Sequence, residues 1–413
     1  MRKIPKILRL VIPASGILLL FVVAHFGHHL VTAILPPLAP YIRDDLKLSY
    51  TQWGFLQSAF ALSYGFSQVP LGWLSDRLGR RALITLGISG MAFFAILIGI
   101  APNYYFLMGF LILMGIMGGG YHPAAAPLVS ATVDSSQRGR ALGIHQLGGT
   151  ASQLVAPLFV AGIVTLWGWR GSYLSVGAGT FLLGVLLFIL LKRNKQGGEI
   201  TAKVMGKPKL KEKFSANFLV GIIAFLIFST FIQGLISTAI SFSTLFLVDR
   251  FAVSSRLAAT MYILITSGGL LGGPISGYLS DRLGSLKIVI FLSLLAVPVI
   301  YLLTLVPFNF LTVGFLLALI GMCQWGRMPV SESYVMNETS ERGRSTILGF
   351  YYAGGRAFPG LISPVVGIIT DHWGIGVSYA VIAITIAVTT VVCFPFILQK
   401  RRRNIGIKND SVL

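Results

Sequence analysis

Long apolar runs separated by short polar gaps divide this sequence, and this pattern restricts the chain to a membrane. A helix needs about 20 mostly apolar residues to cross the hydrocarbon core, and about twelve runs approach or exceed this length. Only 11% of the 413 residues are charged and 55% are hydrophobic, whereas a soluble domain carries about 25% charged residues. We therefore expect an all-α membrane protein of twelve transmembrane helices. The expected spans are 10–38, 50–75, 82–101, 104–132, 139–166, 171–192, 217–247, 256–280, 286–306, 308–337, 343–370 and 375–398.

The two halves of the chain repeat each other around a polar stretch rich in lysine and glycine. The segment Leu74–Gly79 reads LSDRLG, and so does Leu279–Gly284 at the equivalent span. Trp167-Gly168 returns as Trp373-Gly374. Parallel repeats of this kind predict two six-helix pseudo-repeat bundles, with a substrate site near the midplane between them. The expected parts are a bundle at 1–192, a cytoplasmic linker at 193–216, a bundle at 217–398 and a cytoplasmic tail at 399–413.

The distribution of basic residues predicts the orientation. Most of the 33 Lys and Arg lie at the termini, in the linker and in the gaps on the same side. The other side holds Arg43, Lys47, Arg170, Arg250 and Arg256. By the positive-inside rule both termini are cytoplasmic. The net charge of +20 then faces anionic lipid rather than nucleic acid. We expect a monomeric, multi-pass protein of the plasma membrane.

The loop after the second expected span carries a recognisable motif. Its residues, Gly72 to Arg81, read GWLSDRLGRR, which resembles the signature G-x-x-x-D-(R/K)-x-G-(R/K)-(R/K) of the major facilitator superfamily. The second copy has Ser285-Leu286 in place of the basic pair. The resemblance implies a transporter that alternates between two access states. The stretch around His122-Pro123 is also similar to the fosmidomycin-resistance-type branch, although Ala124 replaces the acid expected there.

The same loop is the expected conformational latch. A carboxylate at the end of a long helix can pair with a neighbouring helix N-terminus or an arginine. If that contact forms in only one access state, it biases the equilibrium between the states. The alternative is that the loop is only a positive-inside turn, in which the aspartate ends the helix. The expected latch residues are Gly72, Asp76, Arg77, Gly79, Arg80, Asp281 and Arg282.

Ionisable groups inside the spans indicate the substrate path, because they are costly in lipid. Arg356 lies about 18 Å into its span at 1.5 Å per residue, so it should face a cavity or an anion; the alternative is a structural partnership with Glu332. Arg327 has the same two readings, since Glu332 follows it at a spacing that is poor for a same-face pair. The expected substrate-binding residues are Arg356, Arg327, His122, His28, Gln153, Gln233 and Tyr352.

Histidines are the other ionisable groups of the spans. His25, His28 and His29 share one helix face, and a histidine titrates near neutral pH. We assign proton coupling to His122, Glu332 and His25, with helix packing as the alternative for the histidines. We expect no metal site, because no carboxylate or cysteine in the span of His25 completes one. We also expect no cofactor and no enzymatic activity, since nucleophile–base and phosphate-loop motifs are missing.

Two arginines against one glutamate predict a small organic anion as substrate, with protons as the coupling ion. Drug efflux by an antiporter is the main alternative, because 12% of the residues are aromatic. Such antiporters usually need a membrane-embedded acid in the N-terminal half, and the first four spans lack one. A membrane sensor that does not transport is a third possibility. It would have a tightly packed midplane.

Overall fold

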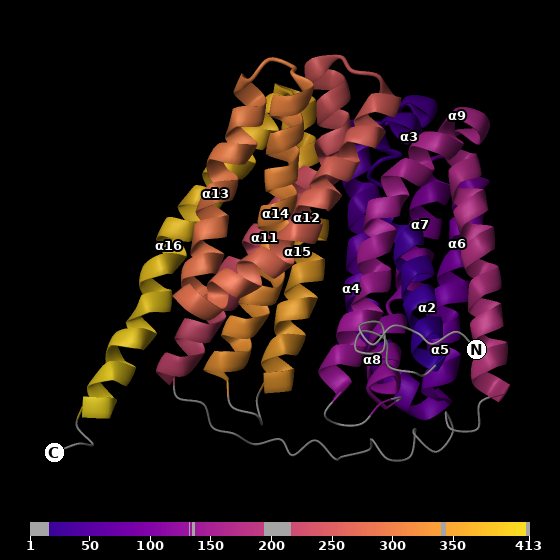
Figure 1. The fold of residues 1–413 in the computed structure, drawn as a ribbon. Coiled ribbons are helices and arrows are strands. Elements are labelled where there is room, and N and C mark those ends of the chain that lie inside the picture. Colours follow the sequence, from indigo (N-terminus) through magenta and orange to yellow (C-terminus); the bar gives the residue numbers. More distant parts are fainter. Residues whose placement is uncertain (1–15, 132, 134–136, 194–215, 340–343, 410–413) are drawn as a thin grey trace, which may run out of the picture. The chain divides into compact units, whose positions relative to one another are not determined.

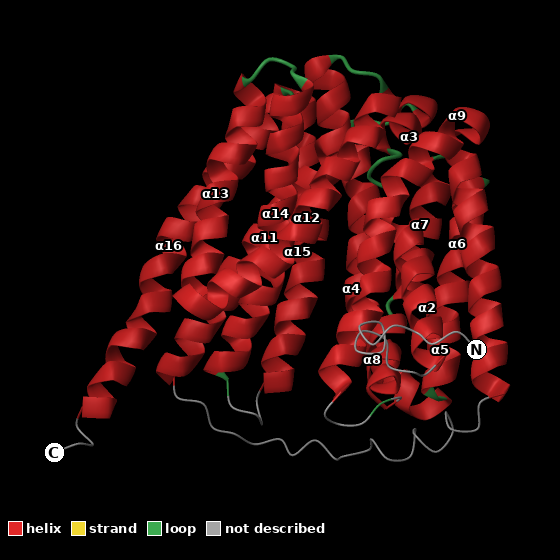
Figure 2. Ribbon diagram, viewed as in Figure 1, coloured by secondary structure: helices red, strands yellow, loops and turns green. Residues whose placement is uncertain are grey.

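The computed structural model describes the chain except for residues 1–15, 132, 134–136, 194–215, 340–343 and 410–413. The described residues form helices joined by loops and turns, without strands (Figures 1 and 2). This confirms the predicted all-α class. The chain divides into two compact units. The first comprises Met1–Lys47 and Ala59–Lys207, and the second comprises Leu48–Ser58 and Pro208–Leu413.

The first unit contains several helices that are interrupted along their length. A π-helical turn lies between two α-helical segments of one span, and a break at Gly119-Gly120 separates α7 from α8. The helix α9 has 56 residues, or about 84 Å, which exceeds two hydrocarbon cores of about 30 Å. It breaks at Gly168, whose φ of 65° is left-handed, so α9 supplies two passes. The helices are α2 (Gly16–Ala33), α3 (Ala39–Leu46), α4 (Tyr50–Leu78), α5 (Arg80–Thr85), η1 (Leu86–Gly90), α6 (Met91–Gly99), α7 (Tyr104–Gly118), α8 (Tyr121–Ala131) and α9 (Arg138–Arg193).

The second unit consists of longer helices and the first turns of α4. Its helices are α11 (Ala216–Phe251), α12 (Ser255–Leu283), α13 (Ser285–Leu305), α14 (Phe310–Glu338), α15 (Arg344–Trp373) and α16 (Ile375–Asn409). Across the described chain, 8 helical segments are long and apolar enough to cross a membrane. One of these segments is the double-length α9. The chain is therefore a multi-pass membrane protein, and the full count of twelve stays a prediction.

The sequence repeat has the same local conformation in both units. Gly79 after α4 has φ 90° and ψ 137°, and Gly284 after α12 has φ 91° and ψ 139°. A positive φ of this size favours glycine, which lacks a Cβ atom. The preceding arginines also behave alike. The guanidinium of Arg77 lies 3.7 Å from the ring centroid of Trp73, and that of Arg282 lies 4.4 Å from that of Tyr278. The two loops are thus structural copies of each other.

The helices α7 and α14 begin with the same cap, which adds a second structural repeat. The side chain of Asn103 accepts hydrogen bonds from the backbone of Tyr105 at 3.1 Å and Phe106 at 3.2 Å. Asn309 does the same at the start of α14, at 3.0 and 3.1 Å. An asparagine cap satisfies amide groups that the helix leaves without partners. Both caps mark the gaps where the sequence predicted turns.

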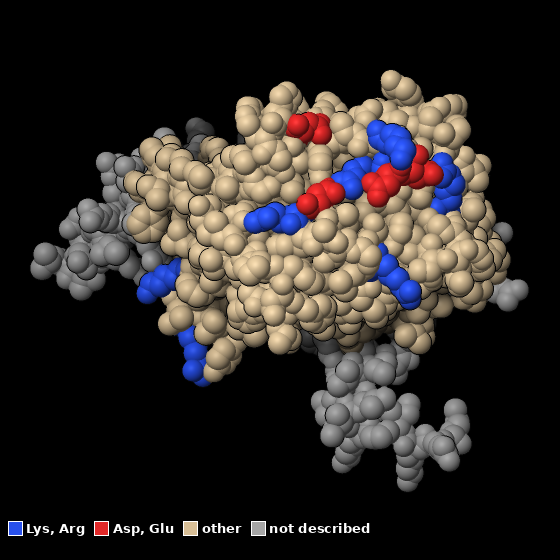
Figure 3. Space-filling view, turned by 90° about the horizontal axis from the view of Figure 1, so that it is seen from above, with Lys and Arg blue, Asp and Glu red and all other residues tan. Residues whose placement is uncertain are grey.

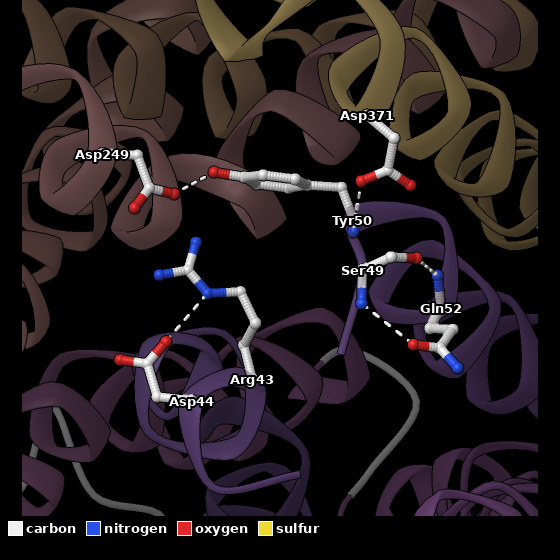
Figure 4. Close-up of polar contacts among 7 residues, drawn as sticks. All are labelled: Arg43, Asp44, Ser49, Tyr50, Gln52, Asp249 and Asp371. Atoms are coloured by element: carbon white, nitrogen blue, oxygen red, sulfur yellow. Dashed lines mark hydrogen bonds and ion pairs between the residues drawn. The ribbon is translucent and has the colours of Figure 1, made fainter. Parts of the chain in front are cut away.

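The start of α4 is held by side chains of the second unit (Figure 4). Ser49 and Gln52 form a reciprocal capping box, in which each side chain accepts from the other residue's backbone, at 2.9 and 3.1 Å. This pattern satisfies two amides of the first turn. Asp371 of α15 accepts from the amides of Tyr50 and Thr51, both at 2.8 Å. The hydroxyl of Tyr50 donates to Asp249 of α11. These contacts explain why Leu48–Ser58 belongs to the second unit although the rest of α4 belongs to the first.

A polar cluster at the end of α3 joins this short helix to α9. Asp45 accepts hydrogen bonds from Arg170 at 2.5 Å and from Trp169 at 3.1 Å. Arg170 also donates to the carbonyl of Ala101 at 3.3 Å. The hydrogen bond from Arg170 is the main reason that the pKa of Asp45 is lowered from its usual value. Figure 3 shows a row of acidic and basic side chains beside each other on the surface seen from above, with isolated charged side chains elsewhere on it.

Asp45→Asn is expected to lower the free energy of unfolding by about 0.2–1 kcal/mol at neutral pH, the range of an exposed ion pair. The folded pKa lies below the unfolded value of about 3.9, so the contribution is present above that pH and is lost as the pH falls through the folded pKa. Melting curves of the two proteins should therefore converge at low pH. Asp44→Asn is the matched control, because Asp44 bonds its neighbour Arg43. A difference in melting temperature between wild type and Asp45→Asn that is the same at neutral and at low pH would contradict this account.

Candidate functional site

Each unit contains one cluster of polar side chains that includes residues predicted from the sequence. The histidine cluster of the first unit consists of His25, His28 and His29 on α2, His122 on α8 and His145 on α9. It gathers five of the chain's 6 histidines. The arginine cluster of the second unit lies on α11, α14 and α15. It consists of Ser229, Gln233, Arg327, Glu332, Tyr351 and Tyr352, and Arg356 follows one turn beyond Tyr352 on α15.

Two glycines of α9 bring the histidine cluster together. A Cβ atom at Gly149 would lie 2.8 Å from Cε1 of His25 and 2.9 Å from Cδ2 of His29. A Cβ atom at Gly148 would collide with the backbone carbonyl of Val22. Such distances require something to move, so any larger residue would push α2 away from α9. The sequence Gly148-Gly149 therefore sets how closely the two helices approach.

Hydrogen bonds to carbonyl oxygens fix the orientation of two rings. Nδ1 of His25 donates to the carbonyl of His145 at 2.9 Å, so a neutral His25 carries its lone pair on Nε2. Nδ1 of His28 donates to the carbonyl of Gly87 at 3.1 Å, and its Nε2 lies 3.1 Å from the hydroxyl of Tyr64. Both nitrogens of His28 are engaged and its side chain is fully buried. His28 thus connects α2 with α4 and η1, and the substrate-binding role that the sequence gives it stays a prediction.

The remaining rings surround His25. The ring of His145 stacks on it at 4.1 Å, and the ring of His122 meets it edge-on at 5.3 Å. Tyr121, adjacent to His122, places its hydroxyl 3.0 Å from Nε2 of His145. The possible ligand atoms of His25, His29 and His122 all lie within 4.8 Å of one another. His29 and His122 are half-buried and His25 is buried.

Arg327 is the most unusual residue of the arginine cluster, because its charged side chain is only 2% exposed. Its Nη2 donates to the carbonyl of Ser229 at 3.3 Å, and its guanidinium lies 5.9 Å from the ring centroid of Phe228. Its Nε has no hydrogen-bond partner within the described part of the chain. No described carboxylate forms an ion pair with it either. The alternative in which Arg327 pairs with Glu332 is therefore absent from this conformation.

Hydroxyl groups lie around Arg327. The side chains of Ser229 and Ser331 are hydrogen-bonded to each other at 2.8 Å. The hydroxyl of Tyr351 donates to the carbonyl of Met328 at 3.3 Å, and Tyr351 interacts electrostatically with Arg327. These donors and the guanidinium together form a surrounding that suits a negatively charged group.

Glu332 and Arg356 are more exposed than Arg327. Glu332 is half-buried and interacts with Tyr352 of α15. Tyr352 and Arg356 are exposed and four residues apart, so they share one face of α15. Gln233 of α11 lies against the same helix, because a Cβ atom at Gly355 would be 3.1 Å from its Oε1. The structure thus places Glu332 beside Tyr352 and Gln233 beside Gly355, with Arg356 one turn beyond Tyr352 on α15.

The candidate residues of the first half do not all lie in one cluster. His25 and His122 meet in the histidine cluster, together with His28. Gln153 is half-buried on α9, about two turns beyond His145. Sequence reasoning gave no role to Tyr121, which the neighbouring His122 could have indicated. It also gave none to Ser229 and Ser331, which are ordinary serines in apolar runs.

Known proteins resemble this chain in sequence. The sequence matches the profile of the Major Facilitator Superfamily over residues 21–346 and 226–411. The chain belongs to this superfamily. The probable L-galactonate transporter of Escherichia coli (strain K12) is 33% identical over 164 residues, which are 39% of this chain and 35% of that relative. The multidrug resistance protein MdtG of Proteus mirabilis (strain HI4320) is 26% identical over 319 residues, which are 74% and 76% of the two chains.

Solved structures of the superfamily share the fold. The crystal structure of a bacterial homolog to the human lysosomal transporter Spinster, in an inward-facing and occupied conformation, aligns with a TM-score of 0.74. The alignment covers 93% of this chain and 96% of that structure at 18% identity, so it supports the fold alone. With the profile match and the apolar helices, the chain is a multi-pass membrane protein of this superfamily.

The signature loop of the superfamily is described in part. Arg77 is exposed and stacks on Trp73, whereas Arg80 is 7% exposed. Asp281 and Arg282 are exposed in the second copy. The side chain of Asp76 lies outside the described residues. The latch role of the loop stays a prediction.

Proposed function

We propose that this protein is a secondary transporter that moves a small organic anion across the plasma membrane by alternating access, coupled to protons. The observation that carries the proposal is Arg327. A buried charge without an opposite charge costs several kcal/mol, and the described residues supply no carboxylate partner. A substrate anion would supply the missing charge, with hydrogen bonds from the hydroxyl groups around it. Both termini are cytoplasmic in this proposal, because the basic residues gather on that side.

A relative supports the chemical class of the substrate. The matched transporter of Escherichia coli is named for L-galactonate, which is a carboxylate. Arg356 provides a second cation on α15. Because a guanidinium can bind both oxygens of one carboxylate, two arginines suit an acid with one or two carboxylates.

A thermal-shift panel tests the substrate class. The purified protein is heated with small mono- and dicarboxylates, phosphonates and lipophilic cationic dyes in separate samples. A ligand that binds the native state raises the melting temperature in proportion to RT ln(1 + [L]/Kd). We expect anions to stabilise the protein and cations to leave it unchanged. Stabilisation by the cations alone would replace this proposal with drug efflux, for which the relative MdtG is the precedent.

We assign the coupling proton to Glu332. Its carboxylate is half-buried on α14 and interacts with Tyr352. A carboxylate in this position can change its charge during the cycle, and the arginine that shares its cluster responds to that charge. The coupling roles that the sequence also gives to His122 and His25 stay predictions.

Asp76→Asn is expected to reduce the transport rate at least about 10-fold while the substrate Kd changes little, because the loop acts on the equilibrium between access states. Uptake and equilibrium binding, measured on the same preparation, separate the two effects. Asp44→Asn is the control, since Asp44 is an exposed aspartate outside the loop. Normal turnover of Asp76→Asn at normal expression would count decisively against the latch.

A further inference from the structure

We propose that His25, His29 and His122 form a binding site in the first unit for a divalent transition cation of the Zn²⁺ class. The proposal goes beyond anion transport, because none of these residues belongs to the arginine cluster. It also differs from the expectation of no metal site. That expectation considered the span of His25 alone, whereas the third imidazole comes from α8.

The three rings are arranged as a ligand set. His25 and His29 stand four residues apart on α2, the spacing that places two imidazoles on one helix face toward the same ion. His122 lies in the first turn of α8 and completes the group, with all ligand atoms within 4.8 Å of one another. Bonds of about 2.0–2.1 Å to zinc place ligand nitrogens about 3.4 Å apart in a tetrahedron. Rotation of the half-buried side chains of His29 and His122 would close the remaining distance.

The surroundings of His25 prepare it as a ligand. Its Nδ1 donates to the carbonyl of His145 at 2.9 Å, which leaves Nε2 as the donor atom for a metal. Metal-binding histidines almost always have their second nitrogen held by a carbonyl or a carboxylate in this way. The ring of His145 stacks on this imidazole at 4.1 Å. The lack of a side chain at Gly149 leaves room for it. The orientation is therefore fixed without a bound ion.

The donor set determines which cation fits. Three neutral imidazoles suit Zn²⁺, Cu²⁺, Ni²⁺ or Co²⁺. Ca²⁺ and Mg²⁺ require oxygen ligands, and the group contains only histidines among the described residues. Three protein ligands also leave a fourth position open for water or another small ligand. His28 takes no part, because both of its nitrogens are engaged with Gly87 and Tyr64.

Zn²⁺ binding to the full-length protein tests the site. The protein is purified with a tag that contains no histidine, treated with a chelator and titrated with Zn²⁺ by calorimetry. We expect one ion per chain and no heat with Mg²⁺. His29→Ala and His122→Ala should each weaken binding at least about 10-fold, since even loss of a supporting residue costs 10–100-fold. His372→Ala should leave the Kd unchanged, because His372 is an exposed residue at the end of α15.

Co²⁺ provides a second readout that reports geometry. The wild-type protein should show the visible ligand-field bands of tetrahedral Co²⁺, and His29→Gln, which preserves most of the side-chain volume, should lose them. Monodispersity and melting temperature show that each variant is folded. Absence of Zn²⁺ binding to the folded wild-type protein would overturn the proposal, and so would equal binding by His29→Ala and His122→Ala. Binding that survives in Arg327→Met separates this site from the proposed transport function.

Discussion

Arg327→Met is expected to abolish the stabilisation of the protein by organic anions while leaving the ligand-free protein as stable as the wild type or more so. The reason is that Arg327 is 2% exposed and has no carboxylate partner among the described residues. Replacing buried charged groups with apolar ones of similar volume is often neutral or stabilising by about 1–4 kcal/mol. The lost hydrogen bond to Ser229 offsets part of this gain. Thermal shift with and without the anion measures both effects in one experiment.

The change in ligand-free stability and the change in anion response together separate a binding role of Arg327 from a structural one. If Arg327 serves only to hold the carbonyl of Ser229, Arg327→Met should melt at a lower temperature and still respond to anions. Arg327→Lys keeps a charge but loses the planar fork, so it should recover part of the anion response. Arg256→Ala is the matched control, because Arg256 is an exposed arginine of the same unit.

Glu332→Gln is expected to eliminate accumulation of the anion driven by a proton gradient, while exchange of labelled for unlabelled substrate continues. Glutamine has the size of a protonated glutamate but cannot release a proton, so the coupling step is lost and binding is retained. Proteoliposomes with an acidic exterior measure accumulation, and counterflow at equal pH measures exchange. Glu338→Gln on the same helix is the control, since it lies at the C-terminal end of α14. Loss of both activities in Glu332→Gln would instead assign Glu332 to substrate binding or folding.

The fold was predictable because its signals are local and repeated. The apolar runs approach or exceed the length of a span one by one, and the two LSDRLG segments predict a duplication that Gly79 and Gly284 confirm through nearly equal backbone angles. The breaks within spans were less visible. The π-helical turn at Leu86–Gly90 contains no proline and no charged residue. The assignment of Leu48–Ser58 to the second unit depends on Asp371, which lies more than 300 residues away.

The candidate site was predictable only one helix at a time. Periodicity shows that His25 and His29 share a face, but it cannot show that His122 meets them from another helix. The same limit applies to Arg327. Its spacing from Glu332 left an ion pair between the two residues as an alternative. Only the packing of α11 against α14 shows that the guanidinium reaches Ser229 instead. The hydrogen-bond acceptor for Nδ1 of His25 is the backbone carbonyl of His145, and a carbonyl has no signature in the sequence.

Uptake of a stabilising anion into proteoliposomes tests the central claim most directly. The labelled anion is the strongest hit of the thermal-shift panel, and wild-type protein is compared with Arg327→Met at equal reconstitution. The account predicts that wild-type vesicles accumulate the anion when the exterior is acidic and that Arg327→Met vesicles do not exceed protein-free vesicles. No uptake by wild-type protein in either orientation of the proton gradient, or equal uptake by Arg327→Met, would contradict it.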